Sequence, residues 1–94
     1  MVTVIDVSGS MKPDDVRKAI NESDGDIILV ERGGWLAFES KGQARDAYES
    51  HPWSGASPTS EDYKDVFNNY LRQRGGMFAY VTDAPLCNLL ADIT

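Results

Sequence analysis

The feature that most constrains this chain is a β-branched run that ends in a cluster of oxygen-bearing side chains. Residues 2–5, Val-Thr-Val-Ile, lead directly into Asp6-Val7-Ser8-Gly9-Ser10. A short β-branched run of this kind is typical of a buried strand in an α/β protein. Oxygen side chains at alternate positions just beyond such a strand can converge on one point, and Mg²⁺ or a similar hard cation prefers oxygen ligands. Asp6, Ser8 and Ser10 are therefore candidate metal ligands.

The remaining sequence predicts helices and strands in turn. A helix is expected over residues 13–22, with Pro13 in its first turn and Val16 and Ile20 on one face. Strand-like runs on either side of Gly33-Gly34 predict an antiparallel hairpin. Further helices are expected over residues 42–49, from Thr59 or Ser60 to about 73, and over residues 85–92, with a strand over residues 77–82.

These elements predict a single α/β domain over residues 1–94. Strand–helix–strand connections are right-handed almost without exception. If the last strand pairs with the free side of the first, the result is a three-layer Rossmann-like sheet of about four strands. Its order is 3-2-1-4, with strand 3 antiparallel and helices on both faces.

That topology brings polar residues from three segments to one edge of the sheet. Asp6 leaves the first strand there, and Asp83 leaves the last strand beside it. The long helix runs back along the sheet, so Thr59 at its amino end returns to the same edge. Ligands bind α/β sheets at the carboxyl ends of the strands where connections diverge, so we expect Asp6, Ser8, Ser10, Thr59 and Asp83 to meet there.

Three segments resemble one known family. Residues 5–11 resemble the Asp-x-Ser-x-Ser signature of von Willebrand factor A domains, which opens their metal-ion-dependent adhesion site. Ser57-Pro58-Thr59 is similar to the family's Gly-x-Thr segment, and residues 80–84 resemble its strand ending in Thr-Asp-Gly. The order and strand context of these motifs match across residues 2–84.

The resemblance implies a Mg²⁺ site, or a Mn²⁺ or Ca²⁺ site, that captures a carboxylate of a protein partner. It implies direct contact with the ion from Ser8, Ser10 and Thr59, with Asp6 and Asp83 acting partly through water. Three departures stand out: Ala84 replaces the usual Gly, the residues before Thr59 are not Gly-Gly, and family members are nearly twice as long. We expect a minimal or truncated form, or a sheet edge covered by a second copy or a partner.

Composition narrows the class of partner. The formal charge of −6 provides no basic surface for phosphates, so nucleic acid is not expected to bind. The single Cys87 excludes an internal disulfide framework and favours a reducing compartment. With no leader segment and no long apolar run, the sequence predicts a soluble, cytoplasmic protein without a membrane partner. A homo-oligomer through the exposed sheet edge is possible.

Other interpretations of the same residues exist. Asp6 or Ser10 could simply cap the first helix, Thr59 the long helix and Asp83 the last helix. The chain could be a small acidic scaffold or inhibitor that keeps the turn without the metal. A Mg²⁺-dependent aspartyl phosphotransferase needs a second carboxylate two residues after Asp6, where this chain has Ser8. We therefore expect a metal-dependent protein-interaction module and not an enzyme.

Overall fold

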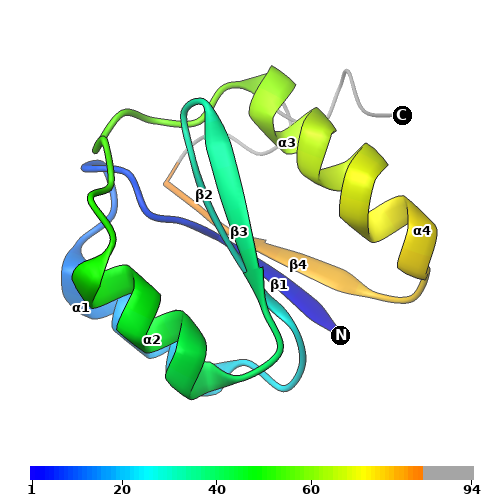
Figure 1. Cartoon of the computed structure of the whole chain (residues 1–94), viewed down its shortest axis with the longest axis horizontal. Coiled ribbons are helices and arrows are strands. Elements are labelled where there is room, and N and C mark those ends of the chain that lie inside the picture. The colour runs from blue at the N-terminus through cyan, green and yellow to red at the C-terminus, as the bar shows by residue number, and fades with distance from the viewer. Residues whose placement is uncertain (84–94) are drawn as a thin grey trace.

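A four-stranded mixed sheet lies between two helical layers in the computed structural model, which describes residues 1–83 (Figure 1). The helices α1 and α2 cover one face, and the helical segment that begins with α3 covers the other. The elements in chain order are β1 (Val2–Asp6), α1 (Pro13–Glu22), β2 (Ile27–Glu31), β3 (Gly34–Phe38), α2 (Lys41–Ser50), α3 (Ser60–Val66), η1 (Phe67–Leu71), α4 (Arg72–Arg74) and β4 (Phe78–Val81).

The strand order is β3-β2-β1-β4, which confirms the predicted topology. The strand β1 pairs in parallel with β2 on one side and β4 on the other, while β2 and β3 form the predicted antiparallel hairpin. In register, Ile5 lies opposite Leu29 of β2 and Val81 of β4. The carboxyl ends of β1 and β4 therefore lie side by side at one edge of the sheet. The segment that follows β1 leaves the sheet between its neighbouring strands, β2 and β4.

Each face of the sheet buries its own apolar cluster, because successive side chains of a strand point to opposite faces. One cluster lies beneath α3 and η1 and the other beneath α1 and α2. The cluster beneath α3 and η1 includes Val4, Ile28, Tyr63 and Val66. The cluster beneath α1 and α2 includes Ile5, Leu29, Val16 and Ile20. Continuous burial of β1 and β2 on both faces explains why their sequences lack a polar–apolar alternation.

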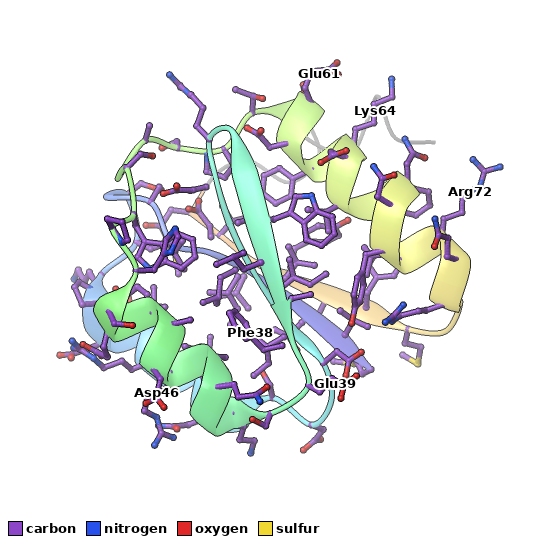
Figure 2. The ribbon with its side chains drawn as sticks, viewed as in Figure 1. Phe38, Glu39, Asp46, Glu61, Lys64 and Arg72 are labelled. Atoms are coloured by element: carbon purple, nitrogen blue, oxygen red, sulfur yellow. The ribbon has the colours of Figure 1, made fainter. Side chains whose placement is uncertain are left out.

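The helices predicted within residues 1–83 are present with small changes at their ends. The helix α1 has the predicted bounds, and α2 is one residue longer at each end than expected. Ser40 caps α2, since its hydroxyl accepts a hydrogen bond from the Gln43 backbone N–H at 3.2 Å. The long helix contains a wider π-helical turn, η1, between α3 and α4. Figure 2 shows Glu61, Lys64 and Arg72 pointing away from the sheet along this segment.

The β2–β3 hairpin is attached to α3 by two hydrogen bonds. The Gly33 backbone N–H donates to Asp62 Oδ1 at 3.0 Å, and the Trp35 indole N–H donates to Asp65 Oδ2 at 2.8 Å. Gly33 has a φ of 88°, a backbone conformation that is strained for residues with a side chain, so glycine suits this turn. These contacts hold the amino end of α3 near the carboxyl end of β2.

At the other side of the sheet, β4 is the outer strand of the part of the chain described. Met77 and Phe78 are both exposed at its start. The expectation that a second copy pairs with this edge stays a prediction. The helix predicted over residues 85–92 lies outside the described residues. Within residues 1–83, no helix has the length and apolar character needed to cross a membrane.

Two leucines that face each other across the hairpin test this account of the core. Leu29 is fully buried, its partner Leu36 is 38% exposed, and the two are paired in register. We expect Leu29→Ala to lower the free energy of unfolding by about 2–5 kcal/mol, because it leaves a cavity. Leu36→Ala should cost less than about 1 kcal/mol. Urea unfolding of both variants checks this, and equal losses would contradict the assignment of the core.

Candidate functional site

The buried carboxylate of Asp6 is the centre of a polar cluster at the carboxyl edge of the sheet. Asp6 ends β1 and is only 1% exposed. Its Oδ1 accepts a hydrogen bond from the Ser8 backbone N–H at 2.8 Å, and its Oδ2 accepts one from the Thr82 hydroxyl at 2.9 Å. A buried carboxylate is costly unless it is hydrogen-bonded, and these two donors come from the segments that follow β1 and β4.

Two serine hydroxyls extend this cluster toward the surface. Ser8 is buried, and its Oγ lies 2.7 Å from the Oγ of Ser10, which is exposed. The Met11 backbone N–H donates to the Ser8 carbonyl at 3.1 Å, which closes the chain into a turn. Asp6, Ser8 and Ser10 therefore lie together in one turn, with the Ser10 end open to solvent.

The simpler idea that Asp6 or Ser10 caps α1 is wrong. The N-cap position of α1 is Lys12, and no side-chain hydrogen bond caps the helix there. The Asp6 and Ser10 side chains instead bond within the turn itself. Their arrangement is not explained by a need to begin α1.

A distant loop over residues 52–58 closes over the turn. The Gly9 backbone N–H donates to the Gly55 carbonyl at 2.8 Å, and Gly55 has a φ of 77°. A side chain at Gly9 would place its Cβ 3.3 Å from that carbonyl oxygen, so glycine permits the close approach. The Ser57 hydroxyl lies 3.5 Å from Ser8 Oγ, within reach of a donated hydrogen bond. Ser57 thus joins the cluster from 49 positions along the chain.

Thr59 has different partners from those we expected of a metal ligand. Its backbone N–H and its hydroxyl both donate to Asp62 Oδ2, at 2.7 and 3.0 Å. Asp62 lies in the first turn of α3, so Thr59 takes the N-cap position that the capping interpretation predicted. The metal role of Thr59 stays a prediction.

Asp83 follows Thr82 directly, beyond the end of β4, and its side chain is exposed. Its position at the same edge as Asp6 follows from the register of β1 and β4. The metal role of Asp83 stays a prediction.

The donor set has the chemistry of a hard-cation site. Among residues 1–83, no three His, Cys, Asp or Glu side chains are grouped so that they could hold a metal ion. A cation at this edge would therefore depend on hydroxyl oxygens as well as on Asp6 and Asp83. Oxygen donors in which neutral groups accompany one or two carboxylates suit Mg²⁺ or Mn²⁺, and the residues present fit such an ion.

Tyr63 of α3 lies beside this cluster on the inner side. The pKa of Tyr63 is raised to about 12, chiefly by burial; the interaction with Thr82 acts to lower it, and the negative charge of Asp6 acts to raise it. The helical spacing of Tyr63 with the apolar Val66 and Phe67 in the sequence predicts a core-facing position, and Tyr63 is fully buried. Its proximity to Thr82 and Asp6 was not predicted.

The sequence-based site omitted Thr82 and Ser57. Thr82 was part of a recognised motif, and a useful signal was available: it is one step beyond Val81, as Asp6 is one step beyond Ile5 in the paired strand. Ser57 had no comparable signal, because loop residues have no periodicity to orient them. Its approach to Ser8 depends on the tertiary path of the loop.

No protein-family model matches the chain, and neither the curated proteins nor the solved structures include one that matches it. The fold is a small α/β domain with a four-strand mixed sheet. The likeness to von Willebrand factor A domains therefore depends on the motifs themselves.

The raised pKa of Tyr63 gives a prediction for alkaline conditions. In the folded state the phenol keeps its proton up to about pH 12, whereas its ordinary pKa is 10.0. The unfolded chain thus binds fewer protons between these values, and the free energy of unfolding falls as pH rises from about 10 to 12. Tyr63→Phe should remove up to about 2–3 kcal/mol of this fall.

Denaturant unfolding at several pH values between 9 and 12 measures the effect. Tyr48→Phe is the comparison variant: burial also raises the pKa of Tyr48, but this residue is only half-buried on α2, so its removal should reduce the fall by less than Tyr63→Phe does. Parallel curves for the parent and Tyr63→Phe would show that Tyr63 titrates normally.

Proposed function

We propose that this chain is a metal-dependent protein-interaction module of the von Willebrand factor A type. The observation that carries the proposal is the buried Asp6 carboxylate beside the Ser8–Ser10 hydroxyl pair, whose oxygens are 2.7 Å apart. This group lies at the carboxyl end of β1, between β2 and β4, where α/β sheets bind ligands.

Asp6, Ser8, Ser10 and Asp83, with a hydroxyl from the loop before α3, would hold a Mg²⁺ or Mn²⁺ ion. Thr59 is the residue that the family motif assigns to that last position. When bound, the ion supplies a position for an oxygen ligand from outside the chain. Because the hydroxyl donors are neutral, much of the ionic charge remains for that outside ligand, and a carboxylate of a partner protein is the natural choice.

The charge of the chain supports dependence on the ion. With a formal charge of −6, the surface repels an acidic group on a partner. A bound cation would reverse this locally and make binding conditional on the metal. The exposed Ser10 leaves the outer side of the cluster accessible to such a group.

A metal-free scaffold is the second candidate, and a specific observation favours it. Both carboxylate oxygens of Asp6 already accept hydrogen bonds from protein donors, and Ser8 and Ser10 satisfy each other. The turn is therefore stable as it stands. In this case residues 6–10 would serve only to form the turn after β1, and the chain would bind a partner through another surface.

A thermal titration separates the two candidates. We expect Mg²⁺ or Mn²⁺ to raise the melting temperature of the parent in proportion to the logarithm of the ion concentration above the dissociation constant, with about 2.7 kcal/mol of stabilisation at one hundred times that constant. For a domain of this size that corresponds to roughly 10–20 °C. Asp6→Asn and Asp83→Asn should abolish the metal-dependent increment.

Asp24→Asn is the matched control, because Asp24 is exposed just before β2 and so lies at the opposite edge of the parallel strands. Absence of any metal-dependent increment in the parent would support the metal-free scaffold instead.

A peptide-display selection tests the ligand class. Peptides enriched in the presence of Mg²⁺ should carry Asp or Glu, and their binding should disappear with a chelator or when that residue becomes Asn or Gln. Binding that persists under both changes would exclude capture of a carboxylate through the ion.

A further inference from the structure

We infer that Ser57, and not Thr59, is the loop hydroxyl that contacts the cation. This inference rests on the proposed function and changes which residue completes its site. It follows from where the two hydroxyls lie in the structure. One belongs to the polar cluster, and the other belongs to the first turn of α3.

The spacing of the cluster oxygens suits a single coordination shell. In an octahedral Mg²⁺ site with bonds of 2.0–2.1 Å, neighbouring ligand oxygens are about 2.9 Å apart. The Ser8 and Ser10 oxygens are 2.7 Å apart, and the Ser57 oxygen is 3.5 Å from that of Ser8. A movement of roughly half an ångström would bring Ser57 to the ideal spacing.

The Ser57 backbone is held in this place by contacts outside its own loop. Arg32, which follows β2, donates through its Nε to the Ser57 carbonyl at 3.1 Å and through its backbone N–H to the Ala56 carbonyl at 3.2 Å. Gly9, between the two serines of the turn, donates to the Gly55 carbonyl at 2.8 Å. The Ser57 backbone is therefore positioned beside Ser8 before any ion arrives.

Thr59 is hydrogen-bonded to Asp62, outside the polar cluster. Its hydroxyl and backbone N–H share Asp62 Oδ2, and Asp62 Oδ1 accepts from the Gly33 backbone N–H. Hydrogen bonds to a carboxylate are stronger than neutral ones. A movement of Thr59 toward Ser8 would break its bonds to Asp62 Oδ2, whereas the Ser57 hydroxyl already lies 3.5 Å from Ser8 Oγ.

The test is a Mn²⁺ titration of the full chain. Binding is monitored by calorimetry and, independently, by the electron paramagnetic resonance signal of free Mn²⁺. Ser57→Ala should weaken Mn²⁺ binding by roughly tenfold or more, as loss of a site residue does. Thr59→Ala should lower the melting temperature and leave Mn²⁺ affinity nearly unchanged. Ser54→Ala, in the same loop, is the control for general loop damage.

Cysteine substitution provides a second measurement, in which a new spectroscopic signal appears and no loss of metal affinity has to be measured. Ser57→Cys should give a sulfur-to-cadmium charge-transfer band with Cd²⁺, because a thiolate in the site is a soft ligand. Thr59→Cys should not. Both variants are made with Cys87→Ser, so that the chain's own thiol does not contribute.

The outcomes are distinct. Loss of Mn²⁺ binding in Thr59→Ala but not in Ser57→Ala would overturn the assignment and leave the proposed function intact. Tighter Mn²⁺ binding in Asp62→Ala would do the same, because that change frees Thr59. A parent chain that binds no Mn²⁺, or whose binding survives Asp6→Asn, would overturn the proposed function and this assignment together.

Discussion

The arrangement of the carboxyl edge of the sheet depends on the satisfaction of one buried carboxylate. Asp6 is almost inaccessible to solvent, and an ionised carboxylate in such a place needs hydrogen-bond donors. It receives one from the Ser8 backbone, which bends the chain after β1, and one from the Thr82 hydroxyl, which joins β1 to β4. One bond thus shapes the turn that carries the serine hydroxyls, and the other adds a side-chain contact to the parallel pairing of β1 with β4.

The β2–β3 hairpin connects α3 and the loop before it to the sheet. One side of the hairpin tip is bonded to Asp62 and Asp65 of α3. The other contacts the loop that precedes α3, since the Glu31 carboxylate accepts from the Ser54 backbone N–H at 2.6 Å and Arg32 binds the Ala56 and Ser57 carbonyls. A hairpin with no residue in the cluster therefore determines which hydroxyl reaches Ser8.

Much of the fold could be predicted, because its signals are local. The hydrophobic stripe of residues 60–73 repeats with helical spacing, and the runs around Gly33-Gly34 have the composition of paired strands. Right-handed crossover then leaves few arrangements of the strands, and order 3-2-1-4 is the one observed. The stripe predicts one continuous helix, and the π-helical turn at Phe67–Leu71 was not predicted.

For the candidate site, the sequence by itself determined the cluster of Asp6, Ser8 and Ser10, because these residues are close along the chain and follow a strand directly. Strand register added Thr82, whose side chain faces the same way as Asp6. Only the tertiary structure places the Ser57 hydroxyl beside Ser8 and the Thr59 hydroxyl on Asp62. The two are two residues apart and chemically alike, so nothing local separates them. The Arg32 and Gly9 contacts hold one hydroxyl at the turn, and Asp62 holds the other at the start of α3.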